Sequence, residues 1–118
     1  MARRNRQVLA LYYSRVREYF ASHPCVDCGE TDIRVLEFDH RPDQVKLADV
    51  AQLISRRQPW SIVQAEILKC DVRCSNCHRR LTGARANSWR QRAYEEDVKR
   101  TRELVRNRLQ MLFPEASM

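Results

Sequence analysis

The sequence is 118 residues long and basic, with a net charge of +7 and a pI of about 9.6. This length predicts a single domain with a modest core, and such cores often need additional stabilisation by a cross-link or a bound metal, called a staple below. No run of about 18 apolar residues is present, so we expect no membrane span. Tyrosines and arginines interrupt the apolar stretch near the N-terminus, and no small-residue cleavage site follows, which argues against a signal peptide. We therefore expect a cytoplasmic protein whose cysteines stay reduced.

The charge is unevenly distributed along the chain. Residues 1–21 carry a net charge of +4 and residues 73–108 a net charge of +7, whereas residues 22–72 between them carry −3. An acidic centre between basic flanks suits a metal site between arms that bind phosphate. Well-solvated arginine-rich helices are the alternative explanation, and charge alone does not decide between the two.

The spacing of apolar residues predicts a helix at the N-terminus and a strand after it. Over residues 5–21 the apolar positions recur at helical spacing and form one face. Pro24 and Gly29 then mark turns around a first Cys-x-x-Cys pair. Residues 33–40 alternate between apolar and polar side chains, as a half-buried strand does.

Two short helices are predicted next. A loop over residues 41–46 leads into a helix over 47–57, which Pro59 ends. Ser61 is expected to cap a second helix over residues 62–69.

The C-terminal part is predicted to contain a second strand and two further helical segments. Residues 70–74 form the strand, and a helix starts near Cys77, with Gly83 as a point of interruption. Residues 87–113 read as one long polar helix with an irregular apolar stripe. The order of elements predicts a small α+β domain.

Four of the five cysteines form two Cys-x-x-Cys pairs. A two-residue gap lets one tight turn point both sulfurs at one ion, and two such pairs complete the closed tetrahedral shell of structural zinc. Redox dithiols or a disulfide are the alternative, which a cytoplasmic location disfavours. Zinc would also be the staple that the small core needs, because its binding free energy becomes folding free energy. The predicted zinc ligands are Cys25, Cys28, Cys74 and Cys77.

Two neighbours of these pairs need a separate explanation. Cys70 is expected to be a small buried apolar residue, with a place in the zinc shell as the minor alternative. His78 directly follows the second pair. Adjacent residues rarely both reach one ion, so His78 is either free for other chemistry or plain surface; a shell of three thiolates and one imidazole is the further alternative.

Asp39 and His40 end the first predicted strand. Asp39 and His78 together offer an oxygen and a nitrogen ligand, which leaves room for water and phosphate oxygens around a divalent ion. An isolated imidazole titrates near about pH 6.5, so His40 is a candidate general base at neutral pH. The alternatives are an aspartate that caps a turn and an ordinary surface histidine.

Together these motifs resemble those of HNH endonucleases that carry a zinc-clipped ββα-metal finger. The resemblance covers roughly residues 24–82 and is closest to small HNH-like proteins of bacteria and their phages. It divides the chain into an N-terminal helix over 1–23, an HNH and zinc core over 24–84, and a basic C-terminal helix and tail over 85–118. The residues that carry it are Cys25, Cys28, Phe38, Asp39, His40, Lys46, Cys74, Asn76, Cys77, His78, Arg79 and Thr82.

The resemblance implies a hydrolase that cleaves or nicks DNA with little sequence preference. Asp39 and His78 would hold the catalytic divalent metal (Mg²⁺, Mn²⁺, Ni²⁺ or Zn²⁺), and His40 would be the general base that activates the attacking water. The cysteine pairs would hold structural zinc. Candidate phosphate contacts, each with solvated surface as the alternative, are Arg41, Lys46, Arg79 and Arg80.

One residue of the family has no counterpart here. The family's middle Asn stands near the start of the second strand and helps to fix the loop that bears the base. In this sequence that stretch is "LKCDV", and Lys69, Cys70 or Asp71 takes its place. A non-catalytic zinc finger that binds nucleic acid is therefore the alternative function. A third possibility is an assembly protein that uses the long C-terminal helix for contacts with a second copy or another protein. The same basic helix could instead follow a DNA backbone.

Overall fold

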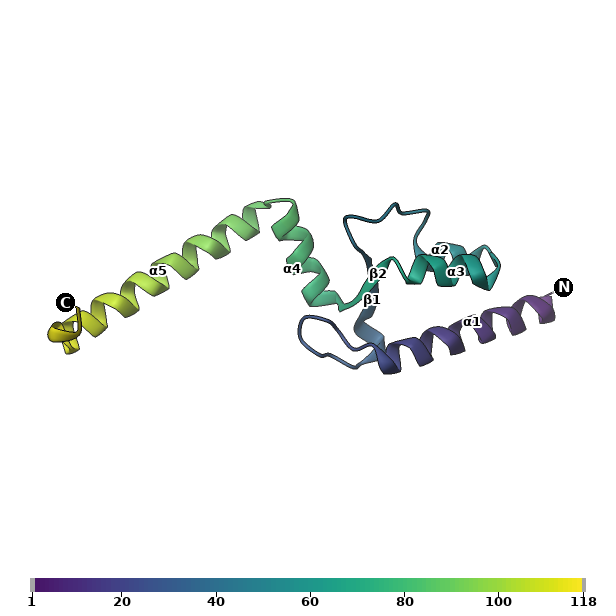
Figure 1. The fold of residues 1–118 in the computed structure, drawn as a ribbon, viewed down its shortest axis with the longest axis horizontal. Coiled ribbons are helices and arrows are strands. Elements are labelled where there is room, and N and C mark those ends of the chain that lie inside the picture. Colours follow the sequence, from purple (N-terminus) through teal and green to yellow (C-terminus); the bar gives the residue numbers. More distant parts are fainter. Residues whose placement is uncertain (1, 118) are drawn as a thin grey trace. The chain divides into compact units, whose positions relative to one another are not determined.

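The computed structural model describes residues 2–117 and shows an α+β protein (Figure 1). Five α-helices and a two-stranded antiparallel sheet lie within these residues, which confirms the predicted α+β class; the HNH-type ββα core stays a prediction. The chain divides into two compact units, Met1–His78 and Arg79–Met118. The assignment of one domain stays a prediction, because compactness of a unit does not establish that it folds alone. No helix in residues 2–117 is both long and apolar enough to cross a membrane.

Helix α1 (Ala2–Ser22) contributes one face to two apolar clusters of the first unit. Tyr12 is buried in the first cluster, and its hydroxyl donates to the carbonyl of Gln58 at 2.8 Å, so the phenol is satisfied inside the core. Phe20 is buried in the second cluster, beside the sheet. The helix predicted over 5–21 is confirmed and extends a few residues further at its N-terminus.

The sheet consists of β1 (Leu36–His40) and β2 (Cys70–Cys74), paired antiparallel with Asp39 opposite Asp71. Successive side chains of a strand point to opposite faces, so each strand presents one apolar and one charged face. The apolar face packs into the two clusters. The other face brings together the charged side chains of Glu37, Asp39, Asp71 and Arg73.

The first strand begins later than predicted. Ile33–Val35 form a short 3-10 helix, η1, instead of strand. The reason is local, because the carboxylate of Asp32 accepts a hydrogen bond from the backbone N–H of Arg34 at 3.0 Å and so caps the turn.

Two short helices, α2 (Val50–Ser55) and α3 (Trp60–Ile67), follow β1 and precede β2 in the sequence. They pack with α1 around the first cluster. The predicted cap at Ser61 is wrong, because α3 begins at Trp60, two residues before the predicted start, and Ser61 lies inside its first turn. Pro59 occupies the N-cap position, and its carbonyl accepts from the backbone N–H groups of the first turn. Trp60 packs partly buried against the core.

Helix α4 (Ser75–Arg85) starts directly after β2 and runs through Gly83, so the predicted interruption there is wrong. The helix ends because Asn87 adopts a left-handed backbone with φ of 48°, and the N–H of Ser88 bonds back to the carbonyl of Gly83 at 3.0 Å. Ser88 then caps α5 (Trp89–Leu112) by accepting from the N–H of Gln91. A short 3-10 turn, η2 (Pro114–Ser117), follows.

Candidate metal centre

The four cysteines of the two Cys-x-x-Cys pairs converge on one point. Their sulfur atoms all lie within 4.8 Å of one another, and the Sγ atoms of Cys28 and Cys74 are 3.7 Å apart. A tetrahedral zinc ion bound at about 2.3 Å holds its sulfur ligands about 3.8 Å apart. The donor set and its spacing therefore fit a zinc-type ion. Within residues 2–117, no other group of three or more His, Cys, Asp or Glu side chains has such spacing.

Local backbone geometry brings the first pair to the second. The loop after Cys25 is closed by a hydrogen bond from the N–H of Gly29 to the carbonyl of Cys25 at 2.9 Å, and Gly29 has a φ of 80°, which favours glycine. The N–H of Val26 bonds to the carbonyl of Val72 at 2.9 Å, which ties this loop to β2. Since Cys74 ends β2, the two pairs are neighbours.

The thiols of Cys25 and Cys77 differ widely in pKa. Burial raises the pKa of Cys25, but hydrogen bonds from the backbone of Cys74, Cys28 and Asp27 outweigh it and lower that pKa to about 6. The hydrogen bond with Cys74, followed by burial, raises the pKa of Cys77 to about 12. Zinc binds thiolates, so binding at this group must release protons.

Cys70 lies outside this group and is a buried apolar thiol, as predicted. Its side chain is 5 % exposed, and its Sγ donates to the carbonyl of Glu66 at 3.4 Å. Burial and the neighbouring Glu66 carboxylate raise the pKa of Cys70 to about 11, so it stays protonated at neutral pH.

A second constellation joins β1 to α4. The Oδ1 atom of Asp39 lies 3.3 Å from the Nε2 atom of His78, and the Asp39 side chain is only 6 % exposed. A cation bound at about 2.1 Å to both atoms would separate them by about 3.0–3.4 Å, so the pair fits two ligands of one divalent ion. Glu37 lies on the other side of the imidazole, with its Oε1 atom 3.8 Å from Nδ1.

Arg73 is the main partner of the other Asp39 oxygen. Its Nη1 atom donates to Oδ2 of Asp39 at 2.8 Å and lies 3.3 Å from Asp71, while its Nε atom donates to Asp27 at 2.8 Å. The hydrogen bond to Asp27 raises the pKa of Arg73 above its ordinary value; burial opposes this rise and the hydrogen bond to Asp39 adds to it. Three acids therefore surround one guanidinium group, and Asp39 is held in one orientation.

The ring of His40 lies against a different acid. Its Nε2 atom is 2.7 Å from Oε2 of Glu66, and the two side chains are 14 % and 1 % exposed. Glu66 also accepts from Lys69 Nζ at 2.9 Å and from the backbone N–H of Leu47 at 3.0 Å. Burial raises the pKa of Glu66, but these hydrogen bonds outweigh it and lower the pKa to about 2. Glu66 is thus a buried carboxylate that stays ionised.

The four candidate phosphate contacts have different surroundings. The guanidinium group of Arg41 donates to the carbonyls of Cys70 and Leu68, and Lys46 pairs with Asp49. Arg41 and Lys46, which belong to the first unit, are therefore both bound to other groups of the protein. The other two candidates are exposed on the part of α4 that belongs to the second unit: Arg79 and Arg80.

Sequence reasoning missed the acids and bases that hold the candidate site residues. Glu66 had a signal, because it lies on the core face of an apolar helix, where a charged residue needs a partner. Arg73 had a weaker signal, because it shares one strand face with Asp71. Neither partner could be assigned without the strand register and the position of α3.

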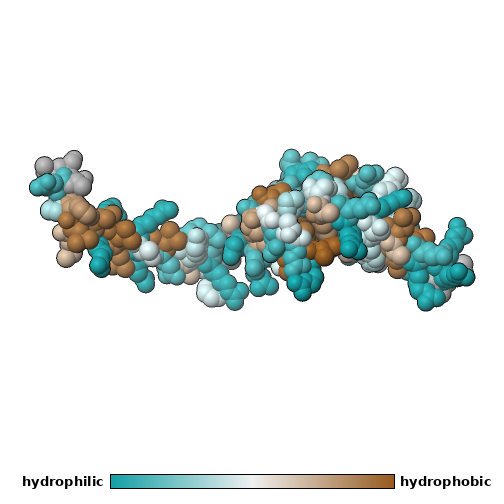
Figure 2. Space-filling model, turned by 90° about the horizontal axis from the view of Figure 1, so that it is seen from below, coloured by the Kyte–Doolittle hydropathy of each residue, from teal (hydrophilic) through white to brown (hydrophobic). Residues whose placement is uncertain are grey.

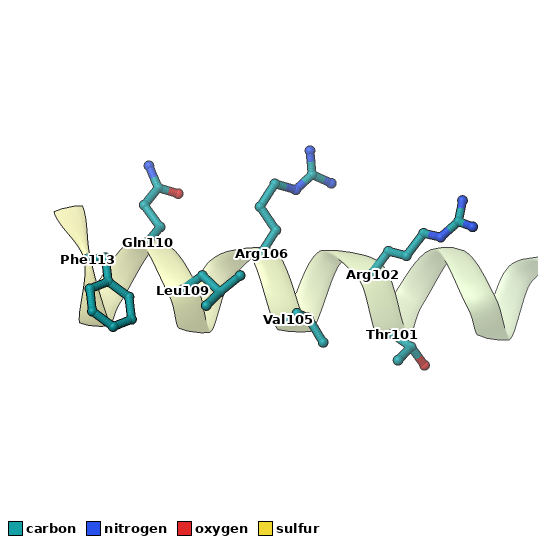
Figure 3. A pocket seen from close by; sticks show the side chains of 7 residues that line it. All are labelled: Thr101, Arg102, Val105, Arg106, Leu109, Gln110 and Phe113. Carbon is teal, nitrogen blue, oxygen red and sulfur yellow. The ribbon is translucent and has the colours of Figure 1, made fainter. Parts of the chain in front are cut away.

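The second unit presents an amphipathic helix. Figure 2 shows apolar side chains exposed along α5 towards its C-terminal end, and Val105 and Leu109 are each about half exposed. In Figure 3, Val105, Leu109 and Phe113 project from one side of the helix, whereas Arg102 and Arg106 project from the other. The predicted apolar stripe is confirmed; its use for DNA, a second copy or another partner stays a prediction.

Comparison with known proteins adds no family to this description. No family model matches the chain, and neither a curated protein nor a solved structure shows significant similarity to it.

Proposed function

We propose that this protein is a metal-dependent endonuclease of the HNH class that hydrolyses or nicks DNA with little sequence preference. The observation that supports it best is the pairing of the Asp39 carboxylate with the His78 imidazole, 3.3 Å apart. These residues lie on β1 and α4, and the four-cysteine group brings the loop after Cys25 to the end of β2 and the start of α4. A two-ligand shell of one oxygen and one nitrogen leaves positions for water and phosphate oxygens.

Each residue of the proposed site has one role. Asp39 and His78 hold the divalent ion, which when bound supplies charge stabilisation for the phosphate and the leaving oxygen. Arg73 keeps the Asp39 carboxylate oriented. His40 takes a proton from the attacking water, and exposed arginines contact the DNA backbone.

Structural zinc belongs to the same proposal. Cys25, Cys28, Cys74 and Cys77 hold it, and the ion thereby fixes the end of β2 and the start of α4. Because His78 follows Cys77 directly, this zinc also sets the position of the catalytic imidazole. The two metals have separate ligands and separate roles.

The test is cleavage of supercoiled plasmid in Mg²⁺, Mn²⁺ or Ni²⁺ by the wild type and by His40→Ala. We expect the variant to lose roughly 10²- to 10⁴-fold in rate, the usual contribution of a positioned base. The matched control is His23→Ala, since His23 is an exposed histidine at the end of α1 that stacks on Tyr19. Undiminished cleavage by His40→Ala would refute the assignment of the base.

A non-catalytic zinc finger that binds nucleic acid is the second candidate. The observation that favours it is the occupancy of the site by protein groups, because Arg73 binds Asp39 and Glu66 binds His40. Tight, salt-sensitive DNA binding without cleavage in any of the three metals would support this function instead.

A further inference from the structure

Glu66 is a buried charge whose presence the packing of α3 does not require. The residue is 1 % exposed, on the helix face that also buries Val63 and Ile67. An apolar side chain would fill this position without the desolvation cost that a buried carboxylate brings. The partners of Glu66 therefore indicate what the charge is for.

Three donors from three segments hold this carboxylate. His40 at the end of β1 and the backbone N–H of Leu47 contact Oε2, at 2.7 and 3.0 Å, and Lys69 contacts Oε1 at 2.9 Å. Lys69 also donates to the carbonyl of Val45 at 2.7 Å. Glu66 and Lys69, at and just after the C-terminal end of α3, thus hold both the imidazole of His40 and the loop that follows it.

These contacts determine which nitrogen of His40 carries the proton. An ionised carboxylate only accepts hydrogen bonds, and two other donors already hold Glu66 in that form. Nε2 of His40 must therefore be the donor in the 2.7 Å contact. In the neutral ring the free lone pair is then on Nδ1.

We propose that Glu66 is the positioning residue of His40, holding Nε2–H so that Nδ1 is the atom that accepts the proton of the attacking water. This inference rests on the proposed nuclease function. In that step a water O–H bond breaks and its proton moves to Nδ1. The hydroxide oxygen attacks phosphorus, and the bond between phosphorus and the 3′ oxygen breaks. The 3′ oxygen then takes a proton from solvent. Glu66 stabilises the imidazolium that forms.

The kinetic test is a double-mutant cycle on the full chain with plasmid DNA. Glu66→Gln keeps an accepting oxygen but removes the charge, and we expect kcat to fall by roughly 100-fold with KM within about twofold. In a His40→Ala background, the same change should alter the residual rate by less than about twofold. Equal losses in both backgrounds would overturn the proposal, because a purely structural effect does not depend on His40.

A control separates positioning from simple loss of stability. Val63→Ala on the same helix opens a cavity without touching the carboxylate, since Val63 is fully buried. We expect it to lower the thermal midpoint and leave kcat near that of the wild type. Unchanged kcat in Glu66→Gln, when His40→Ala is inactive, would overturn the role of Glu66 and leave the nuclease assignment intact.

A spectroscopic measurement tests the positioning without cleavage. At about pH 8, where an isolated imidazole is neutral, the ¹⁵N shifts of the His40 ring should show the Nε2–H tautomer in the wild type and a mixture in Glu66→Gln. A wild-type ring with the proton on Nδ1 would overturn the inference. A wild type that shows the Nε2–H tautomer but cuts no DNA would overturn the proposed function alone.

Discussion

The carboxylate of Asp39 illustrates how single residues of this protein serve two partners. One oxygen is bound by Arg73 at 2.8 Å and the other faces His78 at 3.3 Å. Asp39 is nearly buried, so its charge depends on the guanidinium group for compensation. The same contact orients the carboxylate towards the imidazole, which links the stability of the site to its geometry.

Removal of Arg73 should therefore be costly. Arg73→Met keeps most of the side-chain volume but removes the guanidinium group that pairs with the buried Asp39, and we expect a loss of about 3 kcal/mol in the free energy of unfolding, as for other broken buried pairs. The matched control is Arg34→Met, which breaks the pair with Asp32; the Arg34 side chain is 85 % exposed, and exposed pairs contribute little to stability. Urea unfolding measures both, and equal small losses would contradict a buried role for Arg73.

Glu66 predicts an acid-sensitive contribution to stability. Its pKa is about 2 in the folded chain against an ordinary value of 4.5. A lowered pKa stabilises the folded state fully above about pH 4.5, and this contribution disappears as the pH falls towards 2, a change of about 3 kcal/mol. Urea unfolding should show the difference between wild type and Glu66→Gln shrinking from pH 6 to pH 3. A constant difference would contradict the ionised, hydrogen-bonded carboxylate.

At the scale of elements, the two Cys-x-x-Cys pairs connect a loop, the end of β2 and the start of α4. The hydrogen bond between Val26 and Val72 brings the loop to the strand, and Cys74 and Cys77 lie on either side of the strand-to-helix junction. Helix α4 itself is largely polar and buries little besides Cys77. A metal ion held by the four cysteines would therefore attach its first turn to the rest of the first unit.

Loss of one ligand should release this junction. Cys74→Ser should abolish binding of one zinc per chain and lower the thermal midpoint, since structural zinc contributes folding free energy directly. Cys70→Ser is the matched control, because Cys70 is equally buried but lies outside the group of four sulfurs. Zinc content by mass spectrometry and thermal melts distinguish them. Full zinc content in Cys74→Ser would contradict the four-thiolate site.

For the whole molecule, the proposed function predicts two steps of chelation. The proposed catalytic ion would have two protein ligands, whereas a zinc ion would have four cysteine ligands that are mostly buried. A chelator added in increasing amounts should first abolish plasmid cleavage while the circular dichroism spectrum is unchanged, and unfold the first unit only when zinc is removed. Loss of activity and structure at one chelator concentration would contradict separate sites.

The sequence by itself determined the features that depend on short-range spacing. The α+β class, helix α1 and strand β2 follow from apolar periodicity, and the four-cysteine group follows from two Cys-x-x-Cys pairs, because a two-residue gap already fixes where both sulfurs point. The exact helix starts were harder to predict, since neighbouring residues could serve as N-caps as well as Asp32 and Pro59, which cap η1 and α3.

Only the tertiary structure decided the partners of the charged residues. The contacts of Asp39 with Arg73, and of His40 with Glu66, join residues 34 and 26 positions apart in the chain. Such pairs are set by strand register and by the packing of α3 against the sheet, and a shift of one residue in register would turn each side chain to the other face. No periodicity in the sequence carries that information, so the residues that hold the candidate site appear only in the folded chain.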